Sequence, residues 1–267
     1  MSNIKLLSVD MDGTLLNSDL EISNKNLIAL RKLIDNDMQI VFSTGRTFKA
    51  SYYYSKKYNI KAHIICYNGG LVKEADSENF LYSSKMNIEA AKEILYIADM
   101  FDIYTKVYID DVLYVKEESI EAKEFSMTNR IPYKCVGKLY KFIDKEPNMI
   151  VFIDDLPKMN VIKAAVESKF YDLITVTSSS LKGLELISYG NSKKNSLEIL
   201  CNKLGIKNSE VISIGNGLND LEMLEWSEIG VAVKNSDPQL LKKVKEVSDY
   251  TNDENAVYHI LKKYNII

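Results

Sequence analysis

Apolar runs alternate with amphipathic stretches over the first 66 residues of the chain. The run Ile4–Val9 is apolar enough for a strand buried on both faces. Ser23 can cap the helix that follows it. Right-handed crossovers turn such alternation into a doubly wound parallel sheet, so the predicted fold class is α/β. The further predicted elements are a helix over 24–37, a strand over 38–43, a helix over 47–58 and a strand over 62–66.

The pattern changes after Asn68-Gly69-Gly70 and returns to strand–helix alternation near residue 194. The segment between predicts an α+β unit of about a hundred residues. We therefore predict a core of residues 1–83 and 185–267, interrupted by an inserted α/β cap domain at 84–184. The elements expected from residue 71 onward are strands at 71–74, 80–83, 103–109, 112–116, 149–153, 173–177, 211–214 and 229–233, and helices at 88–101, 118–128, 158–168, 194–204 and 219–225.

Composition excludes several classes of function. The chain has 267 residues, a formal net charge of −3 and 46% hydrophobic residues, which is ordinary for a globular protein with one large and one smaller domain. Its lysine-rich stretches are short, so nucleic-acid binding has no support. Lys5 and Asp10 interrupt the first apolar run, so neither a signal peptide nor a membrane span is predicted. We expect a cytoplasmic protein with no membrane partner, and the oligomeric state is not predicted.

Cysteine and histidine chemistry is not indicated either. The three cysteines are far apart, and with two histidines they give no zinc-binding spacing. We expect reduced thiols in the core and no catalytic histidine.

The candidate chemistry begins with Asp10 and Asp12, two carboxylates at the end of the first strand. Open parallel sheets bind their ligands at the carboxyl ends of strands. Two like charges this close need a cation or hydrogen bonds, so the pair predicts a metal site or an acid/base pair. A solvated loop is the alternative.

Three other segments suit a phosphoryl group. Ser43-Thr44-Gly45-Arg46 supplies a hydroxyl and a glycine amide, although the pattern also suits an ordinary N-cap. Lys193 is expected in the first turn of a helix, where a cation needs an anionic partner or full solvation. Gly215 to Asp220 follows a strand with three oxygen-bearing side chains, which suit Mg²⁺ or a turn followed by a helix cap.

Taken in order, these segments resemble the motifs of the haloacid dehalogenase superfamily of aspartyl-phosphate phosphatases. The resemblance is to the Cof-like sugar phosphatase branch with a type IIB α/β cap, and it covers essentially the whole chain. Asp10 to Leu16 matches the first motif, Thr44-Gly45-Arg46 the second, Lys193 the third, and Gly215 to Asp220 most of the fourth. Asn68-Gly69 matches a signature of the branch.

The resemblance implies a role for each matching residue. Asp10 would attack phosphorus, and Asp12 would protonate the leaving alcohol, for which its pKa should lie nearer neutrality than that of Asp10. Thr44, Gly45 and Lys193 would bind the phosphoryl oxygens. The remaining implied positions are Met11, Arg46, Asn68 and Gly69 for substrate or phosphate, and Asp10, the carbonyl of Asp12, Asn216, Asn219 and Asp220 for Mg²⁺ and its waters.

One departure falls on the metal site. The fourth motif usually reads Gly-Asp-x-x-Asn-Asp, and Asn216 stands where its first Asp would ligate Mg²⁺. A carboxamide oxygen can coordinate Mg²⁺ but carries no negative charge, so the affinity should fall. Three hypotheses follow: a weakened phosphatase, a phosphate-binding pseudoenzyme, or an active enzyme into which Asn216 was introduced. Asn235 and Asn255 lie in segments that also depart from the branch.

Two further questions stay open on the sequence. A signalling receiver domain also uses a doubly wound sheet with an acidic pair, a hydroxyl and a lysine, but receivers are shorter and lack an insertion. The cap should select the substrate, a small phosphorylated metabolite such as a sugar phosphate. Its residues Tyr108, Asp110, Asp111 and Tyr114 could meet a sugar or form a solvated hairpin, and the hairpin is favoured.

Overall fold

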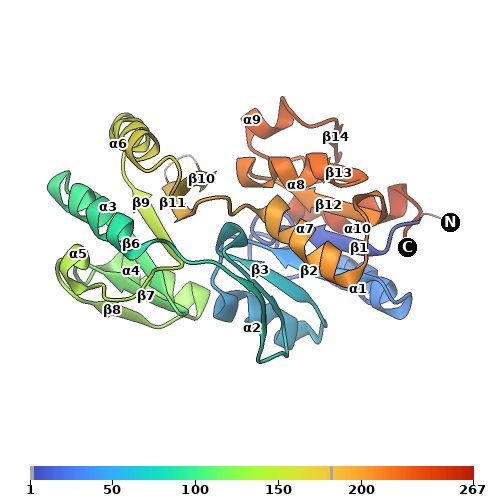
Figure 1. The fold of residues 1–267 in the computed structure, drawn as a ribbon. Helices are drawn as coiled ribbons and strands as arrows, with labels where there is room; N and C mark the ends of the chain where they lie inside the picture. The colour runs from blue at the N-terminus through green and yellow to red at the C-terminus, as the bar shows by residue number, and fades with distance from the viewer. Residues whose placement is uncertain (1–2, 181–182) are drawn as a thin grey trace. The chain divides into compact units, whose positions relative to one another are not determined.

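The computed structural model describes residues 3–180 and 183–267, which form two compact units (Figure 1). The first unit is discontinuous and comprises the chain up to Gly45, Ser51–Tyr82 and Ser192–Ile267. The second comprises Arg46–Ala50 and Ser83–Asn191. Within the described residues, each unit is built on one sheet.

The sheet of the first unit is mainly parallel. All pairs from β14 to β3 are parallel, and β4 is antiparallel to β3. The strand β1 lies inside the sheet between β12 and β2. In spatial order the strands are β14 (Glu246–Val247), β13 (Ile229–Ala232), β12 (Val211–Gly215), β1 (Leu6–Val9), β2 (Gln39–Ser43), β3 (His63–Cys66), β4 (Leu71–Glu74) and β5 (Phe80–Ser83).

Helices pack against this sheet through apolar stripes. Leu197 and Leu200 of α7 and Met223 of α8 form one cluster with Leu6 of β1 and Val41 of β2. At the other end of the chain, α10 contacts α1, which contacts β2. The helices are α1 (Asn24–Asp35), α2 (Phe48–Tyr58), α7 (Lys193–Leu204), α8 (Leu221–Trp226), α9 (Pro238–Leu241) and α10 (Ala256–Lys263).

The local signals for these elements agree with the structure. The Ser23 side chain accepts a hydrogen bond from the backbone N–H of Asn26, as expected of the N-cap of α1. The strands β1, β2 and β3 lie where apolar runs predicted them, within one residue at each end except at the start of β1. The prediction of a parallel α/β sheet is confirmed.

The second unit is an α+β fold. Its sheet is antiparallel except for the parallel pair β7 and β8. In spatial order its strands are β10 (Ile174–Ser180), β11 (Gly183–Ser188), β9 (Met149–Ile153), β6 (Tyr104–Ile109), β7 (Val112–Val115) and β8 (Tyr133–Cys135). Its helices are α3 (Ile88–Met100), α4 (Ile120–Asn129), α5 (Leu139–Phe142) and α6 (Leu156–Lys169).

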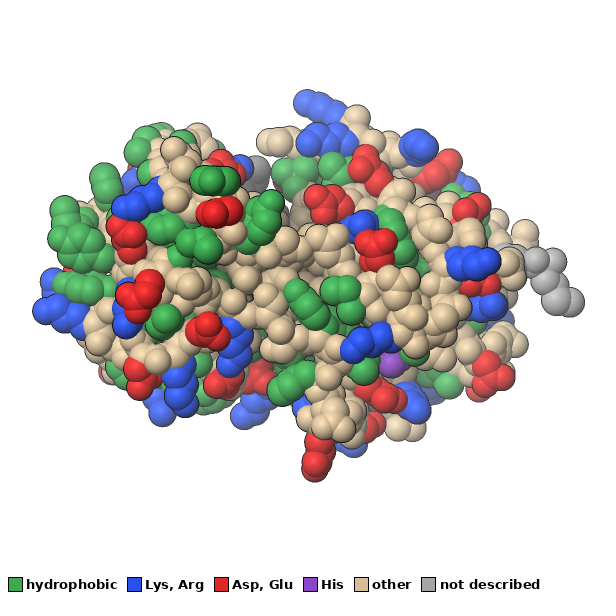
Figure 2. Space-filling view, viewed as in Figure 1, with side chains coloured by type: hydrophobic (Ala, Val, Ile, Leu, Met, Phe, Trp, Pro, Cys, Tyr) green, Lys and Arg blue, Asp and Glu red, His purple; other side chains and the backbone are tan. Residues whose placement is uncertain are grey.

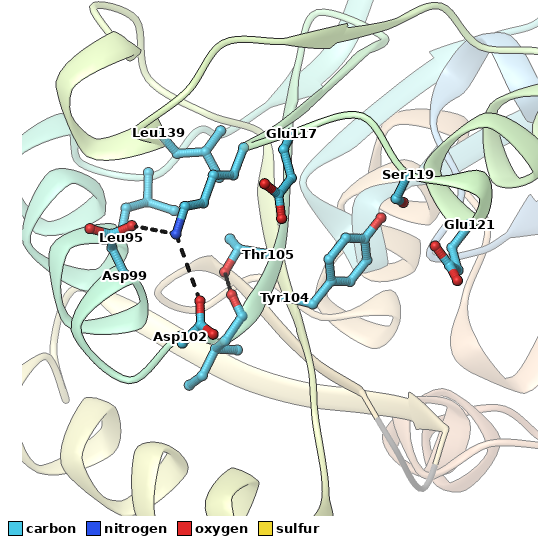
Figure 3. A pocket seen from close by; sticks show the side chains of 11 residues that line it. Leu95, Asp99, Asp102, Tyr104, Thr105, Glu117, Ser119, Glu121 and Leu139 are labelled. Atoms are coloured by element: carbon cyan, nitrogen blue, oxygen red, sulfur yellow. Dashed lines mark hydrogen bonds and ion pairs between the residues drawn. The ribbon is translucent and has the colours of Figure 1, made fainter.

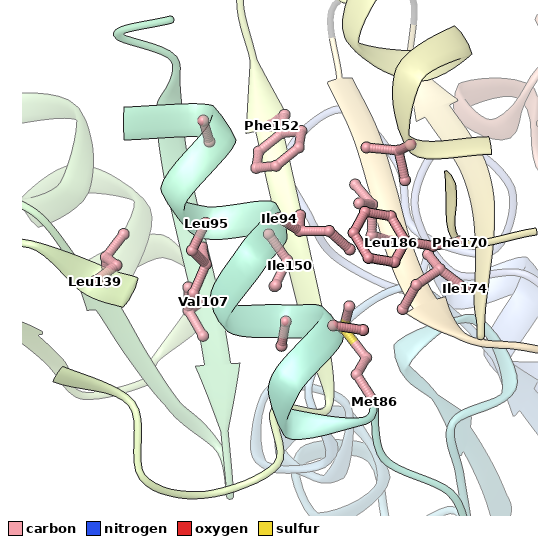
Figure 4. Packing of buried hydrophobic residues seen from close by; sticks show 14 of the residues in the cluster. Met86, Ile94, Leu95, Val107, Leu139, Ile150, Phe152, Phe170, Ile174 and Leu186 are labelled. Carbon is pink, nitrogen blue, oxygen red and sulfur yellow. The ribbon is translucent and has the colours of Figure 1, made fainter. Parts of the chain in front are cut away.

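One hydrophobic cluster holds the second unit together (Figure 4). Ile94 and Leu95 of α3 pack on Val107 of β6 and on Ile150 and Phe152 of β9. Ile150 and Phe152 are two residues apart on β9, and Ile150 lies directly opposite Val107 of β6, which places the three side chains on one face of the sheet. The cluster extends to β10, β11 and α6 through Ile174, Leu186 and Phe170.

The second end of the predicted insertion differs from the structure. A boundary between residues 184 and 185 falls inside β11, which pairs with both β9 and β10. The second unit continues to Asn191, because Leu186 packs in its hydrophobic cluster. The first boundary, near residue 83, lies within β5.

The thiol prediction is correct for two cysteines and wrong for the third. Cys66 and Cys201 are buried and form no disulfide within the described residues, but Cys135 on β8 is exposed. β8 is a three-residue edge strand that the sequence pattern did not predict, so one side of it faces solvent.

Lys106 on β6 is a buried cation in the second unit. Lys106 is 6% exposed, and its ammonium lies 3.5 Å from the centroid of the Phe125 ring. It forms no ion pair within residues 3–180 and 183–267. Burial lowers the pKa of Lys106 from 10.5 to about 8. A ring face replaces only part of the hydration that an ammonium loses.

We expect Lys106→Met to stabilise the protein at pH 7 by on the order of 1 kcal/mol. The unfolded chain binds the Lys106 proton more tightly than the folded chain, so the stability of the native protein rises as the pH goes from 8 to 10.5. The advantage of the variant should therefore shrink over that range. Urea unfolding at pH 7 and pH 10 measures it, with the exposed Lys123→Met as control. An advantage independent of pH would contradict a lowered pKa.

Charged side chains of both signs are interspersed over the face shown in Figure 2. No single sign dominates that face, in line with the small net charge. Within the described ranges, none of the helices has both the length and the apolar character that crossing a bilayer requires.

Candidate active site

Asp10 lies directly after β1, in the interior of the first sheet. Its backbone N–H donates to the carbonyl of Ile214 on β12, so the chain is still held to the neighbouring strand at this point. The residue is only 5% exposed. The carboxyl ends of β1, β2 and β12 point the same way because these strands are parallel.

Lys193 joins Asp10 to the fourth motif. Its Nζ lies 2.7 Å from Oδ1 of Asp10 and 2.7 Å from Oδ1 of Asp220. Ser192 caps α7 by accepting from the backbone N–H of Asn195, which fixes the first turn where Lys193 lies. The lysine side chain is 1% exposed, so the alternative of a solvated lysine is wrong. Its anionic partners are the two carboxylates.

The Asp10–Lys193–Asp220 triad has a formal charge of −1 in a buried setting. Burial raises the pKa of Asp10 to about 7, and Lys193 opposes this shift only in part. Burial alone would lower the pKa of Lys193, but the two carboxylates more than offset it and raise that pKa. Asp10 is the buried member of the acidic pair, and this burial is the cause of its raised pKa. The proton-transfer role of Asp12 stays a prediction.

Asp220 also shapes the loop that contains it. Its Oδ2 accepts from the backbone N–H groups of Asn216 and Gly217, both at 2.9 Å. Asp220 therefore closes the turn as predicted, but within the described residues its side chain makes no cap hydrogen bond to α8, and its Oδ1 binds Lys193 instead. Both carboxylate oxygens have partners, so Asp220 acts here as the support of the loop and the lysine.

Asn68 connects the second and fourth motifs. Its Oδ1 accepts from Nδ2 of Asn219 at 3.0 Å, and its amide lies against Gly45, where a Cβ would come within 3.2 Å of Oδ1. The N–H of Asn68 donates to the carbonyl of Thr44. Thr44 is not the cap of α2, since Thr47 accepts from the N–H of Ala50 there. The N-cap alternative for Thr44 is thus wrong.

Gly69 brings α7 close to this loop. It has a φ of +104°, and a Cβ on it would lie 2.2 Å from the carbonyl oxygen of Ser192. The hydroxyl of Ser196 donates to the Gly69 carbonyl at 2.6 Å. Gly69 therefore places the N-terminus of α7, and with it Lys193; its predicted contact with substrate stays a prediction.

The loop after Asp10 is held by residues near the end of the chain. A Cβ on Gly13 would lie 2.5 Å from Nδ2 of Asn216, so the two residues are in contact. Nδ2 of Asn235 donates to the Gly13 carbonyl at 2.9 Å, and its Oδ1 accepts from the N–H of Asn252. Sequence reasoning noted Asn235 only as part of a departing segment and missed this role.

Three of the predicted site residues, Met11, Asp12 and Arg46, are placed only by their burial and their position in the fold. Met11 is fully buried, so only its backbone could meet a ligand. Asp12 is exposed at the start of the turn, beside Asp10. Arg46 belongs with the second unit, and its part in the site stays a prediction.

Buried polar atoms without hydrogen-bond partners occur at Asp10 and at two hydroxyl groups. Within the described residues, Oδ2 of Asp10 has no hydrogen-bond partner, and the hydroxyls of Thr14 and Ser43 share this condition. Neither hydroxyl was singled out on sequence. A buried carboxylate oxygen without a donor is a costly arrangement that a cation relieves. Oxygen atoms of Asp10, Asn216 and the Asp12 carbonyl form a donor set that suits Mg²⁺.

This donor set is poor in charge. No group of three or more His, Cys, Asp or Glu side chains that could hold a metal occurs in the described part of the chain. In the fourth motif, Asn216 places an amide at the position where a carboxylate would add to such a group. The residues fit Mg²⁺ by atom type and are one negative charge short of a strong site.

The second unit contains a cavity of about 290 Å³ with an acidic lining (Figure 3). Lys116 lies 3.1 Å from Asp99 and 3.7 Å from Asp102 across it. The four cap residues noted on sequence lie elsewhere. Asp110 and Asp111 have φ of +49° and +62° and form the tight turn between β6 and β7, so the hairpin interpretation is correct for them. Tyr108 is buried, and Tyr114 contacts Phe142.

The geometry can now be compared with known proteins. The sequence profile of the haloacid dehalogenase-like hydrolases matches residues 7–261. The chain belongs to this family. It is therefore an enzyme of a hydrolase family, and the predicted family and fold class are confirmed. The match covers both units, which excludes the receiver-domain alternative.

Individual relatives of this haloacid dehalogenase-like hydrolase align over nearly the whole chain. The 5-amino-6-(5-phospho-D-ribitylamino)uracil phosphatase YitU of Bacillus subtilis is 26% identical over 97% of both chains. The crystal structure of TM0651 from Thermotoga maritima is 27% identical, with a TM-score of 0.82 over 97% of both chains. The subclass IIB sugar phosphatase BT4131 shares the fold, with 20% identity and a TM-score of 0.85 over 98% of this chain and all of that one.

Proposed function

We propose that this hydrolase is a Mg²⁺-dependent phosphomonoesterase that acts through a phosphorylated Asp10. The observation that carries the proposal is the buried pair of Asp10 and Lys193. Oδ1 of Asp10 binds the lysine, and Oδ2 has no hydrogen-bond partner among the residues that the structure describes. The ion pair fixes the carboxylate while leaving one oxygen available as a nucleophile.

Asp10 and Lys193 carry out the first step of the proposed reaction. Oδ2 of Asp10 attacks phosphorus in line with the leaving alcohol, and the P–O bond to that alcohol breaks. The Lys193 ammonium, held by Asp220, stabilises negative charge on the phosphoryl oxygens as the group transfers. We assign the same purpose to the backbone N–H of Gly45 and the hydroxyl of Thr44, which follow the end of β2.

Asp12 handles the protons. It is exposed two residues after the nucleophile, where it can give a proton to the leaving alcohol and then take one from water. That water attacks the phosphorus of the acyl phosphate, which releases inorganic phosphate and restores the Asp10 carboxylate. Gly13 and Asn235 keep the turn that contains Asp12 in place.

Asp10, the Asp12 carbonyl and Asn216 would hold Mg²⁺, with Asn219 and Asp220 supporting them. When bound, the ion would supply positive charge that lowers the pKa of Asp10 and neutralises the phosphoryl group. The excess negative charge of the buried Asp10–Lys193–Asp220 triad, which the lysine neutralises only in part, supports this assignment.

Sugar phosphates and related phosphorylated metabolites are the proposed substrates. YitU is named for a phosphate ester of a ribityl chain, and BT4131 is described as a sugar phosphatase. We propose that the second unit selects among them, since a domain inserted into a catalytic core commonly covers the substrate.

Hydrolysis of p-nitrophenyl phosphate with Mg²⁺ and with a chelator tests the proposal, followed by phosphate release from a panel of sugar phosphates. Turnover that requires Mg²⁺ and exceeds that of an Asp10→Asn blank is the expected result. Turnover unchanged by the chelator would show that the reaction does not need Mg²⁺. Turnover equal to that of the Asp10→Asn blank would show that the protein is not a phosphomonoesterase.

Asn216 favours a second candidate, a phosphate-binding pseudoenzyme. A site that is one charge short can hold phosphate on Lys193 and backbone N–H groups without adequate metal for turnover. Calorimetric binding of inorganic phosphate together with absent turnover at excess Mg²⁺ would identify this candidate.

Restoring the carboxylate should strengthen the metal site. Asn216→Asp has the same shape, so it fits against Gly13, and it adds the missing negative charge. We expect activity at limiting Mg²⁺ to rise by about 10-fold to 10²-fold. Mg²⁺ titration of p-nitrophenyl phosphate hydrolysis measures the change, with Asn202→Asp, at an exposed position of α7, as the control for an added charge outside the site. Equal Mg²⁺ dependence in the native protein and Asn216→Asp would show that Asn216 does no harm.

A further inference from the structure

The chain contains two Asn-Gly pairs, Asn68-Gly69 and Asn216-Gly217, in different surroundings. An asparagine side chain can react with the backbone nitrogen of the following residue, and glycine permits this most readily because it has no Cβ to obstruct the approach. The structure decides which of the two asparagines is able to react.

Asn216 combines a hydrogen-bonded backbone with a side-chain amide that touches Gly13 but has no hydrogen-bond partner within the described residues. Its N–H and that of Gly217 both donate to Oδ2 of Asp220 at 2.9 Å, and its carbonyl accepts from the N–H of Asp237 at 2.9 Å. Its side-chain amide makes no hydrogen bond within the described residues, and the residue is only partly buried, so water reaches it.

Asn68 is held in the opposite way. It is 1% exposed, and its Oδ1 accepts from Asn219. Its backbone is left-handed, with a φ of +51°, and Gly69 is packed against the backbone of Ser192. Bringing its side chain onto the Gly69 nitrogen would break these contacts.

We propose that Asn216 is a site of spontaneous deamidation, which converts the amide of the fourth motif into a carboxylate. The Gly217 nitrogen attacks Cγ of Asn216 and passes its proton toward the Asp220 carboxylate with which it is hydrogen-bonded. The Cγ–Nδ2 bond breaks, and Nδ2 leaves as ammonia with that proton. Water then opens the five-membered imide, giving aspartate or isoaspartate at position 216.

The aspartate product adds a negative charge against Gly13, in the loop that follows Asp10. This is the charge that the donor set lacks, so the divalent-cation affinity of the aged protein should increase. The expected increase in cation affinity rests on the proposed function. The deamidation itself does not, because it is detected as a change in peptide mass.

Incubation of the native protein at mildly alkaline pH, followed by trypsin and mass spectrometry, tests the proposal. Cleavage after Lys207 and Lys234 gives peptide 208–234 with Asn216, and cleavage after Lys61 and Lys73 gives peptide 62–73 with Asn68. We expect peptide 208–234 to gain about 1 Da with time while peptide 62–73 stays unchanged. Fragment ions place the gain at Asn216 rather than at Asn208 or Asn219.

Three comparisons make the result decisive. In urea both peptides should gain mass, which shows that the assay detects each Asn-Gly pair. Gly217→Ala and Asn216→Gln should each suppress the gain in the folded protein. Asn216→Gln does so without adding a Cβ at position 217, where one would lie 2.5 Å from Oδ1 of Asn219. No gain at Asn216, or equal gains at Asn216 and Asn68 without urea, would overturn the proposal. Calorimetric titration with MgCl₂ of fresh protein, aged protein and Asn216→Asp measures the consequence for cation binding.

Discussion

Asp10→Asn is expected to lower phosphomonoester turnover by about 10⁴-fold or more, since it removes the proposed nucleophile. The fold should keep its stability. Burial already raises the pKa of Asp10, so a neutral amide of the same shape is at least as well accommodated as the carboxylate. Lys193 retains Asp220 as its anionic partner. Steady-state assays and urea unfolding of the same preparation measure both effects.

Asp19→Asn is the matched control for this variant. Asp19 is an exposed carboxylate nine residues further along the chain, and its replacement should change neither turnover nor stability. Near-native turnover in Asp10→Asn would remove Asp10 from the chemistry. Loss of both turnover and folding would show that the carboxylate mainly serves the structure.

Lys193→Met should have the largest effect on stability, about 3–5 kcal/mol. The methionine fills a similar volume but leaves Asp10 and Asp220 buried together without a cation. An unpaired buried carboxylate is strongly unfavourable, and two of them repel each other. A loss of that size is a large part of the usual stability of a domain. The midpoint of urea unfolding at an unchanged slope measures it.

The neighbouring lysine supplies the control. Lys194 pairs with Glu198 one turn along α7, at 2.6 Å and partly in solvent, and such pairs contribute about 0–1 kcal/mol. Lys194→Met should therefore be nearly neutral. Adding Asp220→Asn to Lys193→Met should recover part of the loss, because one unpaired charge is removed. Equal stability of Lys193→Met and Lys194→Met would mean that ion pairing in the Asp10–Lys193–Asp220 triad does not stabilise the fold.

Local sequence was sufficient for the elements that carry the site. The apolar run that forms β1 and the amphipathic stretch that forms α7 each depend on residues within a few positions, and the structure has both elements. The burial of Lys193 could not be derived in this way. A lysine in a first helical turn is commonly solvated, and its two partners lie 183 and 27 residues away.

The missed features depend on tertiary packing in a similar manner. β11 has alternating leucines, but only its pairing with β9 and β10 shows that it belongs to the second sheet. Asn68 was identified through a family signature, whereas its hydrogen bond to Asn219 follows from the meeting of two loops. The Asn235 contact with Gly13 joins segments 222 residues apart, and no local pattern encodes it.

The discontinuity of the first unit has a consequence during synthesis. β1 pairs with β12, so its sheet stays incomplete until the ribosome has released residues beyond 215, whereas Ser83–Asn191 forms a continuous segment that can fold earlier. Lys193 and Asp220 both belong to the last portion to emerge. A nascent chain therefore holds Asp10 in water, fully hydrated, and the carboxylate is desolvated only when the lysine that neutralises it arrives with the same late segment.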